Sequence, residues 1–533
     1  MKNKKEDNSK ELYQSLWNSA DILRSKMDAN EYKSYLLGLI FYKYLSDAML
    51  NHIVEVLEEK TEDLEEAQKL YEESYKDEQL RLDLIEEIKD EFSYVIEPKL
   101  TFTALINNIN KGEFQLEELA QGFRNIEQSD ETFENLFEDI DLYSKKLGST
   151  PQKQNQAISD VMKELVKLEI VGNDRDVLGD AYEYLIGQFA SDSGKKAGEF
   201  YTPQSVAQLM TRIVLKGKEK DKGFSVYDAT MGSGSLLLNA KRYSKESGTI
   251  AYYGQELNTT TYNLARMNMI LHGVAIGNQH LHNGDTLDSD WPTEEPTNFD
   301  GILMNPPYSA KWTAEKGFLD DPRFGTYGVL APKSKADFAF LLHGYYHLKE
   351  NGVMAIVLPH GVLFRGNAEG KIRKRLLEIG AIETVIGLPS NIFFNTSIPT
   401  TIIVLRKDRS SKEVLFIDAS KKYEKAKNQN IMKEEHIGEI LDAYEKRENK
   451  EKYAYVASFE EIEENEYNLN IPRYVDTFEE EEIDIVELSR EIKELNNEIE
   501  ETEKKIMEML EKLEKTKETE KLIRATKEVF ESE

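Results

Sequence analysis

Apolar positions recur at helical spacing near the start of the chain, most clearly in the segment SYLLGLIFYKYLSDAMLNHIVEVL. A strongly charged stretch follows from Glu58 to Glu91, and no convincing pattern of strands and turns interrupts it. We therefore predict helices over residues 11–150. The segment GSTPQKQNQ, residues 148–156, has the Gly, Ser, Pro and Gln content of a linker, so we expect an N-terminal helical domain over residues 1–155.

The pattern changes from about residue 224, where short apolar runs alternate with amphipathic helical windows. This alternation is typical of βαβ units and predicts an α/β domain with a mainly parallel sheet over residues 156–475. The predicted strands are FSVYD (224–228), IAYYGQE (250–256), FDGILMN (299–305), GVMAIVLP (352–359), IETVIGLP (382–389) and TTIIVLR (400–406).

The last part of the chain, residues 476–533, has a heptad pattern. One heptad position holds Ile485, Ile492, Ile499, Ile506 and Leu513, and the other holds Leu488, Leu495 and Met509, with Thr502 as the exception. Such spacing predicts a coiled-coil tail that packs against another helix. The alternative is a solvated helix that packs on its own domain, because a single chain does not reveal where the partner helix lies.

Composition narrows the function classes. The chain has 533 residues, a net charge of −31 and no cysteine. Disulfide scaffolds, thiolate nucleophiles and Cys-ligated metals are therefore excluded. The N-terminal segment lacks the apolar stretch of a signal peptide, and no run reaches the roughly 18 apolar residues of a membrane span, so we expect a cytoplasmic protein without a membrane partner. A chain this acidic is poorly suited to grip DNA alone.

A glycine loop follows the first predicted strand, in the sequence DATMGSGSLL. It begins at Asp228, carries Gly232, Ser233, Gly234 and Ser235, and precedes an apolar helix. Glycines allow a sharp turn and close approach to a ligand. The dinucleotide fingerprint would need a third glycine where Leu237 stands, and no phosphate-binding lysine motif occurs, so NAD and ATP are poorly supported. Taken alone, the loop could equally be a tight strand-to-helix turn.

Two carboxylates stand at the ends of the next strands. Glu256 ends the second predicted strand, where this fold class binds ribose hydroxyls. Asp285 follows at the next strand end and could bind an adenine amino group or simply be a solvated loop residue. A nucleoside site without a phosphate cradle suits S-adenosylmethionine, whose sulfonium and ammonium groups favour acidic neighbours.

The motif Asn305-Pro306-Pro307-Tyr308 ends the strand FDGILM. Its simplest interpretation is a turn. At a strand end, however, the prolines hold the backbone so that the Asn305 side-chain oxygen and the Pro306 carbonyl can accept hydrogen bonds from one exocyclic amine. The amine lone pair is then free to attack a methyl group, and Tyr308 offers a face for a flipped base.

The order GEFYTPQ, then DATMGSGSLL, then NPPY resembles the modification (methylase) subunit of type I DNA restriction-modification systems, a family of S-adenosylmethionine-dependent adenine-N6 methyltransferases. The helical start, with NEYKSYLLGLIFYKYLSD, is similar to that family's N-terminal domain, and the resemblance covers most of the chain. It implies a Rossmann-like methyltransferase domain. It also implies that the cofactor site includes Ser233 to Ser235, Glu256 and the segment Glu199, Phe200, Tyr201, Thr202, Pro203 and Gln204.

The same resemblance implies partners. In the family, two methylase copies assemble with a specificity subunit that reads double-stranded DNA, and a motor-nuclease restriction subunit joins for cleavage. Recognition of the DNA by the specificity subunit would explain how so acidic a chain acts on DNA. Ala229 departs from the proline that many members carry, which puts little in doubt.

Alternatives remain at this stage. Cytosine-C5 methylation needs a cysteine and is excluded. A protein-glutamine methyltransferase can also use NPPY, although a shorter chain would be expected, and an inactive scaffold would have no use for this motif. His343 and His347 are four residues apart on a predicted helix but lack a zinc-protease motif, so we expect no metal. The cluster of Lys371, Arg373, Lys374 and Arg375 could contact phosphates or be a solvated helix face.

Overall fold

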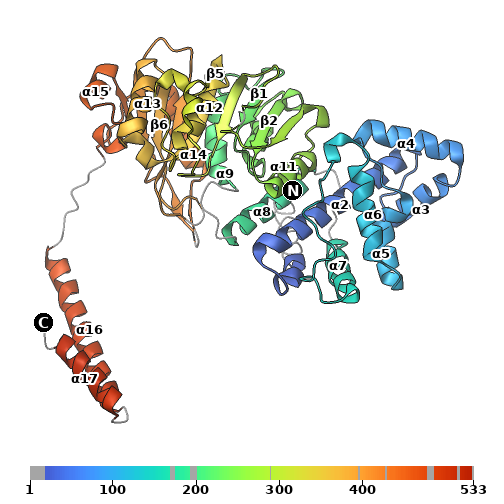
Figure 1. Cartoon of the computed structure of the whole chain (residues 1–533), viewed down its shortest axis with the longest axis horizontal. Coiled ribbons are helices and arrows are strands. Elements are labelled where there is room, and N and C mark those ends of the chain that lie inside the picture. The colour runs from blue at the N-terminus through green and yellow to red at the C-terminus, as the bar shows by residue number, and fades with distance from the viewer. Residues whose placement is uncertain are drawn as a thin grey trace. The chain divides into compact units, whose positions relative to one another are not determined.

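The computed structural model describes residues 18–167, 175–192, 201–288, 290–393, 396–426, 429–476, 485–512 and 516–530. The chain forms two compact units, Met1–Asp476 and Thr477–Glu533 (Figure 1). Three residues named above, Glu199, Phe200 and Leu513, lie outside the described residues.

The N-terminal part of the first unit is built from α-helices. They are α2 (Ala29–Val56), α3 (Leu64–Ser74), α4 (Glu78–Phe92), α5 (Phe102–Lys111), α6 (Leu116–Glu127), α7 (Pro151–Leu165) and α8 (Arg175–Asp192). The predicted helices are thus confirmed over the described residues up to Glu127. The interval from 128 to 150 differs, because it consists of turns and a short 3-10 helix, η2 (Glu131–Phe133).

The segment predicted as a linker, residues 148–156, instead contains the start of α7. Thr150 caps the helix by accepting a hydrogen bond from the Lys153 backbone nitrogen at 3.3 Å, and Pro151 occupies the first turn. Proline is favoured there because the first-turn nitrogens have no partner within the helix. The linker interpretation was therefore wrong at this segment: Gly, Ser and Pro mark a helix start.

A continuous apolar core joins the N-terminal helices to the α/β part. It includes buried side chains of α2, α7 and α8 and three from α11 (Thr259–Leu271), namely Leu264, Met267 and Leu271. Polar contacts add to this packing, since the Thr260 hydroxyl donates to Asp139 at 2.6 Å and the Arg266 guanidinium donates to the Glu134 carbonyl at 3.0 Å. Helix α11 therefore connects the helical region to the sheet.

The α/β part contains a nine-stranded mixed sheet in the order β11-β8-β6-β7-β5-β4-β1-β2-β3. The strands are β1 (Ser225–Asp228), β2 (Ala251–Glu256), β3 (Gln279–Asn283), β4 (Phe299–Met304), β5 (Leu348–Pro359), β6 (Ile382–Gly387), β7 (Thr400–Leu405), β8 (Val414–Asp418) and β11 (Ala454–Ala457). Strands β1 to β5 are parallel, and β7 lies antiparallel between β5 and β6. A separate two-stranded ribbon joins β9 (Glu424–Lys425) to β10 (Asn430–Ile431).

Helices cover both faces of this sheet, and each face has its own apolar core. One core contains residues of α9 (Gln204–Leu215), α10 (Ser235–Tyr243) and α14 (Glu434–Lys446). The other contains residues of α12 (Asp337–Tyr346), α13 (Asn367–Glu378) and α15 (Phe459–Glu464). The three-layer arrangement confirms the Rossmann-like α/β fold, with all six predicted strands present.

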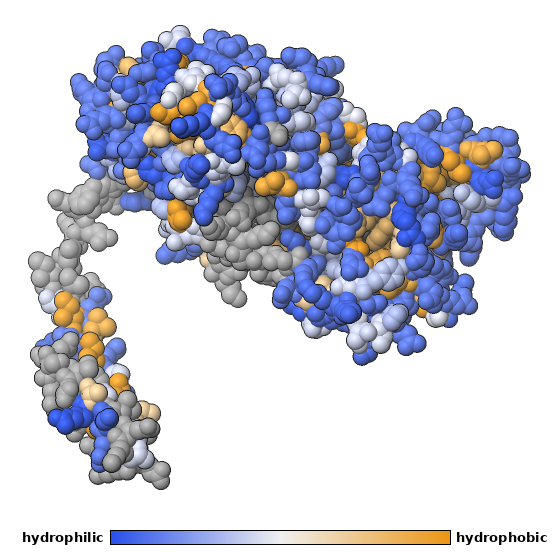
Figure 2. All heavy atoms as spheres, in the orientation of Figure 1, coloured by the Kyte–Doolittle hydropathy of each residue, from blue (hydrophilic) through white to orange (hydrophobic). Residues whose placement is uncertain are grey.

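The second unit comprises α16 (Ile485–Glu511) and α17 (Lys517–Phe530). The helix predicted from the heptads is confirmed. Its apolar stripe stays largely open to solvent, with Ile492 52%, Leu495 58% and Ile499 53% exposed, and Figure 2 shows apolar side chains on the surface of this unit. Among the described residues, no helix has the length and apolar character needed to span a bilayer.

Candidate active site

The site lies at the point in the parallel part of the sheet where the order of successive strands reverses. Chain order runs from β1 outward to β2 and β3, and then returns to place β4 on the other side of β1. Connections therefore leave the carboxyl ends of β1 and β4 in opposite directions, and open α/β sheets bind their ligands at such a switch point. The glycine loop and the NPPY motif follow these two strands directly.

The glycine loop turns from β1 into α10. Gly232 and Gly234 have φ angles of 55° and 78°, in the left-handed region that glycine adopts without strain. A Cβ on Gly234 would also approach Met269 Cε to 3.2 Å, so the loop packs closely on α11. Ser233 and Ser235 are buried, with their hydroxyl oxygens 3.0 Å apart. The structure thus has the tight turn and the helix N-terminus that the sequence predicted.

Glu256 closes one side of this loop from the end of β2. One carboxylate oxygen accepts a hydrogen bond from the Gly232 backbone nitrogen at 3.1 Å, and the other accepts from the Asn258 nitrogen at 2.8 Å. Two N–H donors hold the carboxylate in one orientation beside the loop. This is the position that suits a ribose in such folds.

Asp228 and Asp285 take different places. Asp228 is buried at the end of β1 and accepts from the Thr230 nitrogen at 2.9 Å, and burial raises the pKa of its carboxyl to about 8. Asp285 is partly exposed after β3 and accepts from the Leu287 nitrogen at 2.9 Å. The hydroxyl of Thr286, the residue after Asp285, donates a hydrogen bond to the Ala229 carbonyl at 2.5 Å. This hydrogen bond joins the segment after β3 to the loop after β1.

The segment from Tyr201 to Gln204 reaches two parts of the site. Pro203 caps α9, which Gln204 begins. The Gln204 amide donates to Glu183 on α8 at 2.6 Å, while Thr202 contacts Asn305. Burial raises the pKa of Glu183 to about 7. Glu183 was not predicted from the sequence, where the available signal was an acidic residue within the apolar stretch DAYEYLIGQFA.

Asn305 is buried at the end of β4 and is held at both ends of its amide. Its nitrogen donates to the Thr202 hydroxyl at 3.0 Å, and its oxygen accepts from the Tyr308 hydroxyl at 3.0 Å. Pro306 and Pro307 connect the two residues. The next nitrogen, of Ser309, donates to buried Asp337 at 2.8 Å, which fixes where the motif leaves the sheet.

Tyr308 lies against Phe393, with ring centroids 5.9 Å apart in an edge-to-face arrangement. Burial raises the pKa of the Tyr308 hydroxyl well above its usual range, so the hydroxyl stays protonated and can donate to Asn305. Phe393 was missed by the sequence analysis. It follows β6 in the sequence NIFF, far from NPPY along the chain, where an aromatic pair was the only signal.

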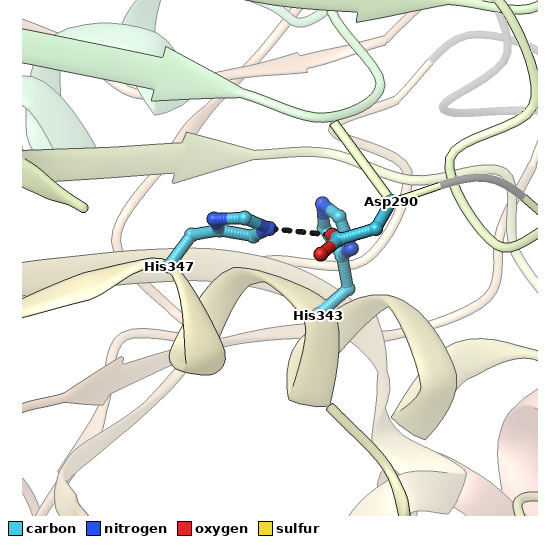
Figure 3. Close-up of side chains that lie close together, drawn as sticks. All are labelled: Asp290, His343 and His347. Carbon is cyan, nitrogen blue, oxygen red and sulfur yellow. Dashed lines mark hydrogen bonds and ion pairs between the residues drawn. The ribbon is translucent and has the colours of Figure 1, made fainter. Parts of the chain in front are cut away.

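His343 lies on α12, His347 follows the last residue of that helix, and both are beside Asp290, as Figure 3 shows. His343 is bonded to the Tyr227 hydroxyl at 2.8 Å and to the Arg323 guanidinium at 3.1 Å. His347 is bonded to the Thr297 carbonyl and, at 2.9 Å, to Asp290. Every ring nitrogen has a partner and one partner is a cation, which disfavours a metal ion.

Arg323 gives this cluster a structural role. It is buried and donates to the Thr286 carbonyl at 2.8 Å and to Asp321 at 2.7 Å. These hydrogen bonds join the loop that follows NPPY to the segment after β3. The two histidines at the C-terminal end of α12 therefore support the two loops that flank the site.

The basic cluster on α13 separates into different roles. Arg373 is buried and donates to the carbonyls of Tyr467 and Val362, so it is a structural residue. Lys374 and Arg375 form ion pairs with Glu378, with Lys374 Nζ 3.9 Å from Oε1 and Arg375 Nη1 3.4 Å from Oε2. Lys371 is exposed on the same helix. Contact of this helix with phosphates therefore stays a prediction for Lys371 and its exposed neighbours only.

Comparison with known proteins agrees with this geometry. The N-6 DNA Methylase family matches residues 173–483, and the HsdM N-terminal domain matches residues 12–165. The Type I restriction enzyme MpnII methylase subunit of Mycoplasma pneumoniae is 35% identical over 525 residues, which cover 93% of this chain and 95% of that protein. The MjaVII methylase subunit of Methanocaldococcus jannaschii is 31% identical and covers 93% and 83%.

A solved structure is also similar over most of the chain. The crystal structure of the type I restriction-modification system methyltransferase subunit from Streptococcus thermophilus is 71% identical, with a TM-score of 0.86, and the match covers 88% of this chain and all of that one (100%). The resemblance inferred from the motifs is confirmed. Family match and relatives both span most of the sequence, so the chain belongs to the N-6 DNA methylase family, among the methylase subunits of type I restriction enzymes.

Proposed function

We propose that this adenine-N6 DNA methyltransferase binds S-adenosylmethionine against the glycine loop and Glu256, and presents a flipped adenine to Asn305 and Tyr308. The observation that carries the proposal is that the two motifs follow the carboxyl ends of the neighbouring strands β1 and β4, where the strand order reverses. Methylation would mark specific host DNA sites and protect them from restriction, in the cytoplasm.

The residues present fit the cofactor. Gly232 and Gly234 turn the backbone sharply into the N-terminus of α10, and the fixed carboxylate of Glu256 beside this turn can accept hydrogen bonds from ribose hydroxyls. Asp228 lies buried at the base of the loop, and Asp285 stands at the next strand end. When bound, the cofactor supplies an electrophilic methyl group.

The target amine needs acceptors that leave its lone pair free. The Asn305 carbonyl oxygen accepts from Tyr308 in this structure and has a second lone pair for a substrate N–H. The Pro306 carbonyl supplies the second acceptor. Held by these two acceptors, the amine would direct its lone pair at the methyl group that the bound cofactor supplies. The Tyr308 and Phe393 rings provide apolar surface for the base.

Partners follow from charge and from the second unit. A chain with a net charge of −31 needs another protein to hold DNA phosphates. We propose that a separate specificity subunit supplies those contacts and reads double-stranded DNA, with two methylase copies for each specificity subunit. The exposed stripe of Ile492, Leu495 and Ile499 is the proposed docking face, because such side chains bury best against another helix. A motor-nuclease restriction subunit would complete the restriction complex.

The experiment that tests this proposal measures transfer of labelled methyl from S-adenosylmethionine to DNA by the chain co-purified with its specificity partner. Asn305→Ala is the matched variant, because it removes the acceptor for the target amine. Loss of one oriented acceptor commonly lowers the rate by about 10²-fold or more. Calorimetry should show that the variant still binds the cofactor, and wild-type turnover in the variant would contradict the assignment.

A further inference from the structure

Thr202 contacts the side chain that holds the target amine. Its hydroxyl oxygen is 3.0 Å from the Asn305 amide nitrogen, across 103 residues of sequence. Both side chains are buried, with Thr202 6% and Asn305 3% exposed. The contact therefore joins the segment before α9 to the end of β4, without solvent access to compete for the hydrogen bond.

The orientation of the Asn305 amide decides whether the site can work. An amide has an acceptor end and a donor end of nearly the same shape, and rotation by half a turn exchanges them. With its oxygen toward the base, Asn305 accepts from the substrate N–H. With its nitrogen there, two donors would face each other, and the amine would not be held.

The two hydroxyl neighbours define one orientation. Thr202 accepts from the amide nitrogen, and Tyr308 donates to the amide oxygen, so the oxygen faces the side of the site occupied by Tyr308. Without the Thr202 oxygen, the buried amide nitrogen would lose its acceptor. A buried donor without a partner is strongly disfavoured, and the amide would rotate or move toward another group.

We propose that Thr202 is a positioning residue for methyl transfer, which holds the Asn305 amide with its carbonyl oxygen toward the target base. This role differs from the contact with the cofactor that the sequence motif implied for Thr202. The inference rests on the proposed function of Asn305, and it assigns to the segment at Tyr201 to Gln204 a part in the chemistry at the base as well as at the cofactor.

Two variants of the full chain test the role. Thr202→Val keeps the shape of the side chain and removes the hydroxyl, whereas Thr202→Ser keeps the hydroxyl and removes a methyl group. In the complex with the specificity partner, kcat should fall by about 10-fold to 100-fold in Thr202→Val and stay near wild type in Thr202→Ser. The dissociation constant for S-adenosylmethionine should be unchanged in both, which a general loss of structure would not allow.

Several outcomes would overturn the inference. Wild-type kcat in Thr202→Val would show that the hydroxyl is not needed, and equal loss in both variants would assign the effect to packing. A change confined to cofactor affinity would return Thr202 to the cofactor site. If Thr202→Val unfolds, Thr202→Ala provides the same comparison with Thr202→Ser. Failure of the proposed function is distinguished by the wild-type complex, which would then transfer no methyl to DNA.

Discussion

Glu256 accepts a hydrogen bond from the backbone nitrogen of Gly232 at 3.1 Å, and this contact ties the end of β2 to the glycine loop after β1. The carboxylate therefore has two tasks in the proposed site. It would bind ribose hydroxyls, and it holds the loop against which the cofactor would lie.

We predict that Glu256→Ala weakens S-adenosylmethionine binding by roughly 1 to 3 kcal/mol, because the ribose loses a charged acceptor and the loop loses its anchor. Calorimetric titration measures the change. Glu256→Gln keeps one acceptor oxygen and should fall between wild type and Glu256→Ala. Glu294→Ala, which removes an exposed carboxylate before β4, is the matched control. An unchanged dissociation constant in Glu256→Ala would remove Glu256 from the ribose site.

Tyr308 should be sensitive to loss of its ring. Tyr308→Ala should lower methyl transfer severely, because base–aromatic stacking contributes roughly 1 to 3 kcal/mol. Tyr308→Phe should be milder, since it keeps the ring and loses only the hydrogen bond to the Asn305 oxygen. Single-turnover rates of the assembled complex separate the two variants. Equal damage from both would show that the hydroxyl, and not the ring, is the essential part.

The free energy of unfolding should depend on pH because of Glu183. Burial raises the pKa of this carboxyl from its ordinary value of 4.5 to about 7 in the folded chain. The folded state thus binds the proton more tightly than the unfolded state, so the free energy of unfolding falls as pH rises from about 4.5 to about 7 and is level above that range.

Glu183→Gln cannot ionise and should remove this fall. The free energy of unfolding of the variant minus that of wild type should be up to about 3 kcal/mol larger at pH 8 than at pH 4.5. Thermal unfolding across this pH range measures the gain, and Glu113→Gln, at an exposed site, is the control. A difference in Tm that does not change with pH would show that Glu183 ionises normally.

The second unit should be needed for assembly and not for cofactor binding. Truncation after Asp476 should leave S-adenosylmethionine affinity intact and impair complex formation and DNA methylation. In the full chain, Ile499→Asp places a charge on the exposed stripe, while Asn497→Asp adds the same charge on the opposite face of the helix. Size-exclusion chromatography with the specificity partner should show loss of the complex for the first variant only. Full assembly of the truncated chain would exclude the docking role.

The sequence predicted those parts of the fold that have a local pattern. The six apolar runs became strands, and the heptads became α16. Strand β3, with the sequence QHLHN, has little apolar character, and its place beside β2 comes from pairing with that strand. The start of α7 was mistaken for a linker because Gly, Ser and Pro are common to both.

The candidate site was predictable as motifs and not as contacts. Asp228, Glu256 and Asn305 were found because each ends a strand of recognisable pattern. The bond between Thr202 and Asn305 and the approach of Phe393 to Tyr308 join segments far apart in the chain. Local spacing carries no information on such contacts, since the arrangement of the whole sheet determines them.

Methyl transfer by this chain to the N6 amine of adenine in DNA can be measured directly. The most direct measurement is mass spectrometry of DNA nucleosides after the co-purified complex has reacted with S-adenosylmethionine labelled in its methyl group. We expect the label in N6-methyladenine, and no label when the complex carries Asn305→Ala. Label in another nucleoside, or in a protein glutamine while DNA stays unlabelled, would show that the chain methylates a different substrate.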